Sequence, residues 1–258
     1  MVDVLSRLVD KAQKSRLTEG FSIGKDKILV SHLQFADDTI FFHSNDVGKF
    51  HNLLKVVDFF CAVSGLKINL RKSSIVGINF QDQKLIDLAS SVGCEIGNWP
   101  LKYLGLPLGG NCGKADFWAP VLEKVERRLD GWKKACLSKG GRLTLIQSVL
   151  SSLCSYFMSL FQIPVSVAKR IEEAMRDFLW EGIGEGKKDH LVSWRVVSQP
   201  QSKGGLGLGN IINRNKALLG KWLWRFPLEV NSLWYCVLKS KYGLHKNGSM
   251  GCIKMVGM

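Results

Sequence analysis

The chain has 258 residues, of which 46% are hydrophobic, and a formal net charge of +14. The hydrophobic fraction is ample for a core, and the positive charge points to a polyanionic partner. Seven scattered cysteines without a C-x-x-C pair give no support for a disulfide framework or a zinc knuckle, so we expect reduced thiols. The most apolar window, residues 150–167, holds five serines, Gln162 and Pro164, which is too polar for a membrane span. No secretory leader is evident, so we expect an intracellular protein, nuclear or cytoplasmic and not secreted.

The first elements are a helix and a β-hairpin. Apolar residues recur at helical spacing over residues 1–14, and residues 18–24 are expected to form a turn region. Two short β-prone runs follow, residues 27–33 and 39–42, and they enclose Phe35-Ala36-Asp37-Asp38. The pattern predicts a hairpin with acidic residues at its turn.

Asp37 and Asp38 place two negative charges within a few Å, which costs energy unless a cation or proton is shared. Carboxylate oxygens are preferred magnesium ligands, and paired ions clamp the oxygens of a phosphoryl transfer. The pair therefore indicates a site for Mg²⁺, or for Mn²⁺. The alternative is a solvated Asp-Asp turn without a ligand.

The chain then alternates between helices and extended segments. Ser44-Asn45-Asp46 offers N-cap side chains to a helix through residues 50–61, and Gly65 is placed to close it. Residues 66–69 and 73–78 are predicted to be extended, residues 83–92 to be a short amphipathic helix, and residues 101–108 to be a Gly/Pro-rich hairpin.

From Lys114 the pattern becomes helical. Three apolar stripes span residues 118–132, 143–157 and 167–179; Gly140-Gly141 is expected to break the chain between the first two, and Pro164 to end the second. The predicted fold is therefore α+β: an α/β part over residues 1–113, helices over 114–182, a Trp-rich helical region over 183–243 and a disordered tail over 244–258.

Positive charge concentrates in the second part. Residues 1–113 carry 13 basic and 11 acidic side chains, whereas residues 114–258 carry 23 and 11. Basic side chains neutralise phosphates independently of sequence, and a solvated face is the alternative for each one. The candidates for backbone contact are Arg127, Arg128, Lys133, Lys134, Lys139 and Arg142. Five tryptophans at 180, 194, 222, 224 and 234 could stack on bases or pack helices.

Six stretches in the same order resemble the reverse transcriptases of non-LTR (LINE-type) retrotransposons, especially the plant members. They are Phe35-Ala36-Asp37-Asp38, Ser64–Ser73, Tyr103–Gly109, Leu137–Ile146, Gly204–Leu208 and Asn215–Arg225. The resemblance implies a partial polymerase palm followed by a thumb. It further implies that Asp37 and Asp38 are catalytic metal ligands, and that Leu104 and Gly105 grip the primer. Lys72 is implied to contact the incoming triphosphate or to protonate the leaving group. The alternatives are a solvated surface lysine and an ordinary Gly/Pro-rich hairpin.

The implied reaction is RNA-directed DNA synthesis with two metal ions, and the implied partners are an RNA template, a DNA primer or an RNA–DNA duplex, and deoxynucleotides, with no membrane. The family's P-x-G box and the palm strand with the first catalytic aspartate do not occur in this chain. We therefore expect a fragment that is inactive by itself. The alternatives are a non-catalytic basic nucleic-acid-binding module, and a relic that exposes a sheet edge and aggregates.

Overall fold

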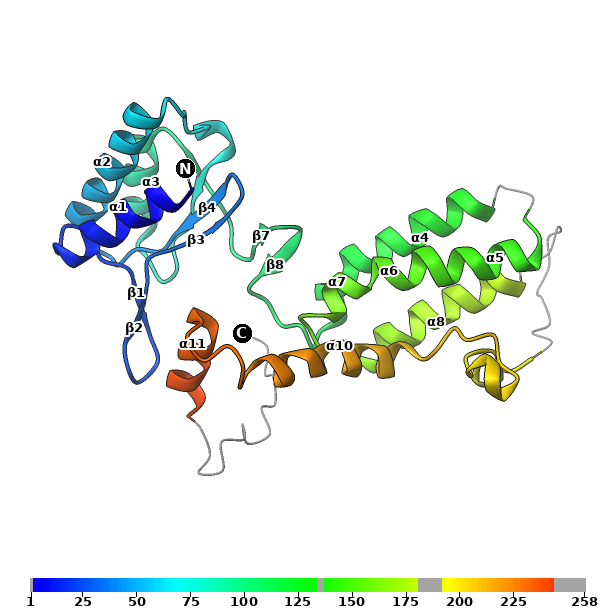
Figure 1. Ribbon diagram of the computed structural model, residues 1–258. Coiled ribbons are helices and arrows are strands. Elements are labelled where there is room, and N and C mark those ends of the chain that lie inside the picture. The colour runs from blue at the N-terminus through cyan, green and yellow to red at the C-terminus, as the bar shows by residue number, and fades with distance from the viewer. Residues whose placement is uncertain (1, 134–136, 181–191, 244–258) are drawn as a thin grey trace. The chain divides into compact units, whose positions relative to one another are not determined.

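The computed structural model describes residues 2–133, 137–180 and 192–243 (Figure 1). They form helices with small two-stranded sheets, which confirms the α+β class. Packing divides them into one unit of residues 2–101 and 229–243 and another of residues 102–228. This division differs from the sequence-based boundary at 113/114. The expected tail, and the boundary loop at 182–188, lie outside the described residues.

The first unit is built around helices α1 (Val2–Lys14) and α2 (Val47–Ser64). They share an apolar core. Helix α1 has one apolar stripe, which it buries, whereas α2 is apolar on more of its surface and also exposes Phe59 and Val63. The caps of α2 are as predicted: the Asp46 carboxylate accepts from the Lys49 N–H, and Gly65, with φ of 73°, donates its N–H to Cys61 O. The buried side chains of this core are Leu5, Val9, Leu53, Val57 and Phe60.

Two β-hairpins join these helices. Strands β1 (Phe21–Ile23) and β2 (Ile28–Val30) form one, and β3 (His32–Phe35) and β4 (Asp38–Phe41) form the other. The prediction of a turn region over residues 18–24 was wrong, because that segment contains β1. The chain reverses after β1 through Gly24 and Lys27, both at positive φ (74° and 49°), and this gives β1 a partner.

The rest of the first unit is a short crossover and a C-terminal helix. Residues 70–72 form the 3₁₀ helix η1 (Leu70–Lys72), and β5 (Ser74–Ile75) pairs in parallel with β6 (Glu95–Ile96) across α3 (Asp82–Val92). Helix α11 (Leu233–Tyr242) packs on β1 and β2. There the Asp26 N–H donates to Ser240 Oγ (2.8 Å).

The second unit begins at the hairpin of β7 (Leu101–Tyr103) and β8 (Leu106–Leu108) and continues as helices. The longest are α4 (Ala119–Lys133), α8 (Val165–Trp180) and α10 (Ile211–Arg225). The shorter ones are η2 (Ala115–Trp118), α5 (Lys139–Leu145), the π-helical turn η3 (Ile146–Leu150), α6 (Ser151–Leu153), α7 (Ser155–Met158), α9 (Trp194–Val197) and η4 (Gln201–Lys203).

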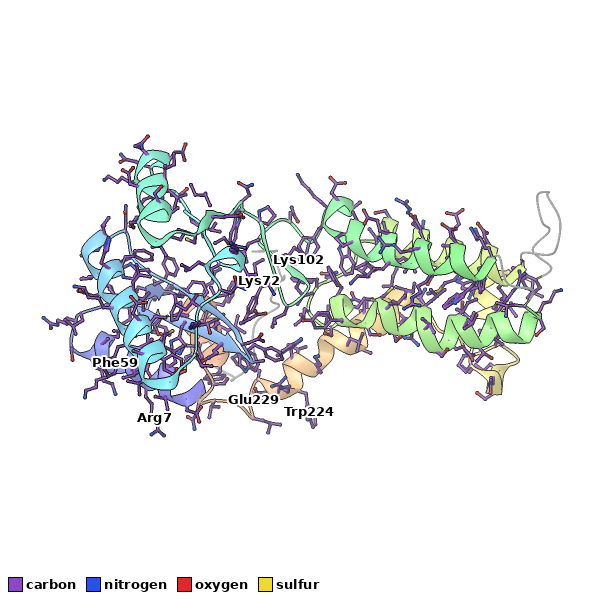
Figure 2. The ribbon with its side chains drawn as sticks, turned by 90° about the horizontal axis from the view of Figure 1, so that it is seen from above. Arg7, Phe59, Lys72, Lys102, Trp224 and Glu229 are labelled. Atoms are coloured by element: carbon purple, nitrogen blue, oxygen red, sulfur yellow. The ribbon has the colours of Figure 1, made fainter. Side chains whose placement is uncertain are left out.

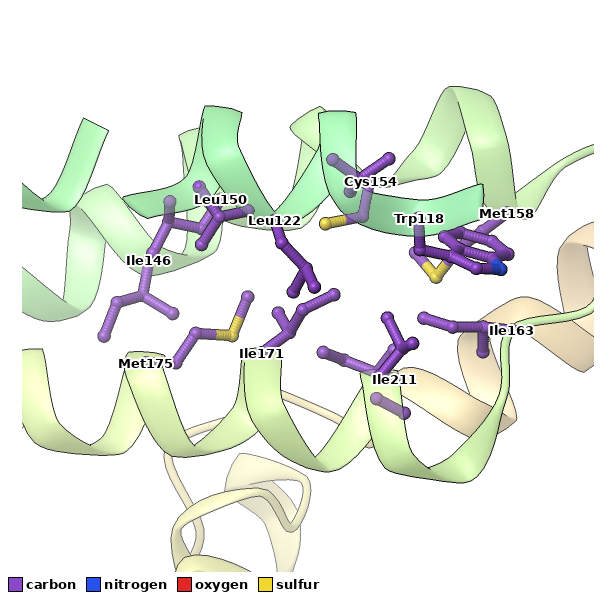
Figure 3. Close-up of a cluster of buried hydrophobic side chains, with 14 of the residues drawn as sticks. Trp118, Leu122, Ile146, Leu150, Cys154, Met158, Ile163, Ile171, Met175 and Ile211 are labelled. Atoms are coloured by element: carbon purple, nitrogen blue, oxygen red, sulfur yellow. The ribbon is translucent and has the colours of Figure 1, made fainter. Parts of the chain in front are cut away.

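A large apolar core holds these helices together (Figure 3). Trp118, Ile146, Leu150, Ile171 and Phe178 are completely buried, and most lie on the predicted stripes. The expected break at Gly140-Gly141 was wrong. Ser138 caps α5 by accepting the Gly141 N–H, so both glycines lie in the first helical turn, where the hydroxyl satisfies a backbone donor.

Within residues 2–133, 137–180 and 192–243, no helix is both long and apolar enough to cross a bilayer.

Candidate functional site

The turn between β3 and β4 carries the two predicted metal ligands. Phe35 pairs with Asp38, which leaves Ala36 and Asp37 as the two central residues. Ala36 has φ of 52°, a left-handed value that a residue with a Cβ seldom adopts. Positive φ at the first central residue is the feature of a type II′ turn, where glycine is usual. The hairpin therefore holds its acidic tip on a strained backbone.

Both aspartates project into solvent. Asp37 and Asp38 are exposed, and neither forms an ion pair with any residue that the structure describes. Alternation along the strands puts Asp38 on the same face as Phe35 and Leu33, which are 62% and 41% exposed. One face of the hairpin is thus open, with two uncompensated negative charges at its end.

The other face is fixed to the helices. His32 Nε2 lies 2.9 Å from Ser6 Oγ of α1, and Phe41 packs against the core between α1 and α2. His32 and Phe41 are opposite each other in the register, so they hold both strands at the end distant from the turn. These contacts orient the acidic turn and do not involve Asp37 or Asp38.

Asp37 and Asp38 together offer two carboxylates, the donor type that magnesium prefers. Mg²⁺ is commonly held by one or two carboxylates and completed by phosphate or water oxygens. In the described part of the chain, no group of three or more His, Cys, Asp or Glu side chains gathers to hold a metal. A two-metal site on this hairpin needs a further ligand from elsewhere.

Lys72 belongs to a different secondary-structure element from Asp37 and Asp38. It ends η1 and its side chain is exposed (Figure 2). Over the described residues, it forms no ion pair with Asp37 or Asp38. The structure therefore leaves its ammonium available to a ligand and does not join it to the acidic turn.

The hairpin of β7 and β8 forms as predicted. Leu104 and Gly105 are its two central residues, with φ of 50° and 77°, and positive φ at both positions is typical of a type I′ turn. The Tyr156 hydroxyl of α7 donates to Leu104 O (3.1 Å). Sequence reasoning did not single out Tyr156, because no local pattern marks a side chain that reaches 52 residues back along the chain.

The basic candidates separate into exposed and engaged side chains. Arg127 and Arg128 are exposed on α4 and form no ion pair with the described residues. Lys133 bonds Asp130 (3.3 Å), and Lys139 lies 5.5 Å from the centroid of the Trp180 ring. Lys134 lies outside the described residues.

The prediction that Arg142 contacts a phosphate backbone was wrong for this fold. Arg142 is only 5% exposed. Its guanidinium donates to Phe178 O (3.1 Å) and lies 5.5 Å from the Phe178 ring centroid. The side chain fastens α5 to α8. In the sequence, Arg142 directly follows the expected break at Gly140-Gly141, and no local pattern shows the carbonyl that it bonds 36 residues away.

Asn215 is a second residue whose role sequence reasoning missed. It is 2% exposed, accepts the Ile163 N–H (3.0 Å), and donates to Met158 O (2.7 Å) and Phe161 O (2.8 Å). A polar residue within the apolar stripe of α10 is the signal that could have identified it. The Asn215 amide bonds backbone groups of the α7–α8 connection. These groups lack partners within a helix, so the side chain satisfies them.

The tryptophans differ in their surroundings. Trp222 Nε1 donates to Ser159 O (2.6 Å), and Trp234 Nε1 donates to Glu229 Oε2 (2.8 Å), so these two support packing. Trp224 is 77% exposed. It remains a candidate for stacking.

Comparisons with known proteins give two plant relatives. The chain is 43% identical over 127 residues to an Arabidopsis thaliana protein whose name refers to ribonuclease H; this is 49% of the chain and 20% of that protein. It is 29% identical over 93 residues, 36% of the chain and 60% of the relative, to an uncharacterized mitochondrial protein of the same plant. The matched segments thus span a fifth and three fifths of these relatives. No family model matches the chain.

Proposed function

We propose that the chain is the palm-hairpin and thumb portion of an RNA-directed DNA polymerase from a plant non-LTR retrotransposon. The observation that carries this proposal is the β3–β4 turn, which presents Asp37 and Asp38 side by side on a hairpin backed by α1 and α2. Similarity to two Arabidopsis proteins, one of them named after ribonuclease H, supports a plant retroelement origin.

In this proposal Asp37 and Asp38 hold magnesium, Asp37 as the stronger ligand. When bound, the ions supply neutralisation of phosphate charge and alignment of the attacking and leaving oxygens. Lys72 contacts the triphosphate, the positive-φ turn at Leu104 and Gly105 brings backbone close to the primer, and Arg127 and Arg128 contact phosphates.

A two-metal site needs a third carboxylate besides Asp37 and Asp38. No such group gathers with them among the described residues, so in this proposal another segment supplies it. We therefore expect no polymerase activity from this chain alone. Extension of a primer on an RNA template in magnesium by the purified chain would contradict this expectation.

The metal site can be tested without catalysis. Titration of the chain with Mn²⁺, followed by electron paramagnetic resonance, should give weak binding that Asp37→Asn abolishes. Asp58→Asn, which changes an exposed aspartate of α2, is the matched control and should bind as the wild type does. Equal binding by wild type and Asp37→Asn would overturn the metal assignment.

A second candidate is a non-catalytic nucleic-acid-binding module. The exposed Arg127 and Arg128, which have no ion-pair partners among the described residues, favour it. The chain should then bind an RNA–DNA duplex with an affinity that falls as salt rises, and replacing both arginines by Gln should lower the slope of log K against log salt by about 2. Arg170→Gln, whose guanidinium is paired with Glu126 (2.7 Å), is the control. Loss of duplex binding in Asp37→Ala would count against this candidate and for a metal-dependent one.

A further inference from the structure

The outward face of α10 carries the most exposed large hydrophobic side chain in the described part of the protein. Trp224 is 77% exposed, and its indole projects away from the helix (Figure 2). Exposing an indole to water is unfavourable, since burying an aromatic ring contributes much of the energy of cores and interfaces. In this structure the ring of Trp224 is therefore largely uncovered and open to a stacking partner.

The opposite face of α10 is fixed to its own unit. Asn215 bonds the α7–α8 connection, and Trp222 Nε1 donates to Ser159 O. Because a helix repeats every 3.6 residues, these anchors leave Trp224 on the far side together with Gly220 and Lys221, four and three residues before it. The outward face is thus held rigidly without help from Trp224.

The helix surface one turn before Trp224 has no side chain, because residue 220 is glycine. A helical side chain leans toward the preceding turn, which places the indole over the region of Gly220. A Cβ built at Gly220 would meet nothing within 4 Å. One edge of the indole is therefore bordered by bare backbone, so a planar group can approach the ring.

The charge of α10 is complementary to a polyanion. The helix contains Arg214, Lys216, Lys221 and Arg225 and no acidic residue. Lys221 Nζ and Arg225 Cζ each lie 5.0 Å from the centroid of the Trp222 ring. Lys221 is also three residues before Trp224, so its backbone lies on the same side of the helix as Trp224.

We propose that Trp224 stacks on an unpaired base of a single-stranded nucleic acid, with Lys221 contacting an adjoining phosphate. Single strands bind where a cationic surface tracks the backbone and aromatic rings stack on bases. Within a duplex, neighbouring bases already cover each base face, so an exposed indole gains little there. This inference rests on the proposed nucleic-acid function and assigns a single-strand contact to the end of α10.

Fluorescence anisotropy of a labelled 12-residue oligouridine provides the test, with the full chain. Trp224→Ala should weaken binding about tenfold, and Trp224→Phe should retain most of the affinity, because stacking needs only a ring. Lys221→Gln should lower the salt slope by about 0.7, the value for one phosphate contact on a single strand. Leu223→Ala, at the 64% exposed neighbour without a ring, should bind as the wild type does.

An unchanged affinity in Trp224→Ala, or an equal loss of affinity for an RNA–DNA duplex, would overturn the proposal. Weaker binding of Trp224→Ala to phosphatidylserine vesicles with unchanged oligouridine binding would overturn it in favour of a membrane surface. If the wild-type chain binds neither oligouridine nor the RNA–DNA duplex, the proposed function is overturned as well. If the wild type binds the duplex and Trp224→Ala does not change oligouridine affinity, only this inference is overturned. Thermal unfolding followed by circular dichroism verifies that each variant is folded.

Discussion

The hydroxyl of Tyr156, on α7, donates a hydrogen bond to the backbone carbonyl of Leu104, at the turn between β7 and β8 (3.1 Å). Leu104 has positive φ, so this bond holds a turn that is unfavourable for a leucine. This bond joins the proposed primer-binding turn to the helical bundle, in addition to Leu106 of β8, which packs in the apolar core.

Tyr156→Phe should loosen this turn with little effect on global stability. The phenol is half exposed, so loss of its bond should cost less than about 1 kcal/mol. Hydrogen exchange measured by mass spectrometry should be faster over residues 101–108 in the variant. Tyr242→Phe, which alters another half-exposed tyrosine, is the control. Unchanged exchange at the turn would show that the bond does not hold it.

Arg142 and Arg128 should respond oppositely to substitution. Arg142→Met removes a buried charge-assisted bond to Phe178 O and should lower the free energy of unfolding by about 2–3 kcal/mol. Arg128→Gln changes an exposed side chain, so its stability should stay within about 0.5 kcal/mol. Urea unfolding checks both. A stable Arg142→Met variant with weakened duplex binding would restore Arg142 to the candidate nucleic-acid surface.

Asn215→Leu should be among the most destabilising changes in the second unit. It would leave the Ile163 N–H and the carbonyls of Met158 and Phe161 without their side-chain partner, at about 1–3 kcal/mol for each unsatisfied group. Asn213→Leu, at an exposed position of the same helix, should be nearly neutral. A shift in Tm of equal size for the two variants would contradict this account.

Ala36→Gly should stabilise the first unit by about 1 kcal/mol, because the left-handed backbone at φ of 52° penalises a Cβ. Ala217→Gly lies in the exposed interior of α10, where glycine costs about 1 kcal/mol. The two identical substitutions should therefore move Tm in opposite directions. A decrease in both would indicate that the strain at Ala36 is absent in solution.

Stability should fall at alkaline pH through Cys154. Burial raises the pKa of this thiol to about 11 from its ordinary 9.0, and the Arg214 guanidinium partly offsets the effect. The unfolded chain then loses its proton first, so stability is full below pH 9 and declines by about 2–3 kcal/mol as pH rises toward 11. In Cys154→Ala the free energy of unfolding, measured by urea titration at a series of pH values, should no longer decline in this way between pH 9 and pH 11. Leu150→Ala removes a buried neighbour without a titrating group and should lower the whole curve without flattening it.

Local patterns predicted the elements that depend on nearby residues. The cap at Asp46, the closing Gly65 and the stripe of α8 were confirmed, because capping bonds and helical periodicity act within a few positions. The hairpin around Asp37 was confirmed for the same reason. Strand β1 was missed, since its three residues gain strand character only by pairing with β2.

The sequence by itself determined the α+β class, the acidic hairpin turn and the excess of positive charge after Lys114, all of which follow from residue type and short-range spacing. Only the tertiary structure decided which polar side chains are buried. Arg142 and Asn215 fasten the helices because distant carbonyls need partners there, whereas Trp224 is exposed because Asn215 and Trp222 occupy the inner face of α10. Burial depends on what packs from far along the chain, and local sequence does not encode it.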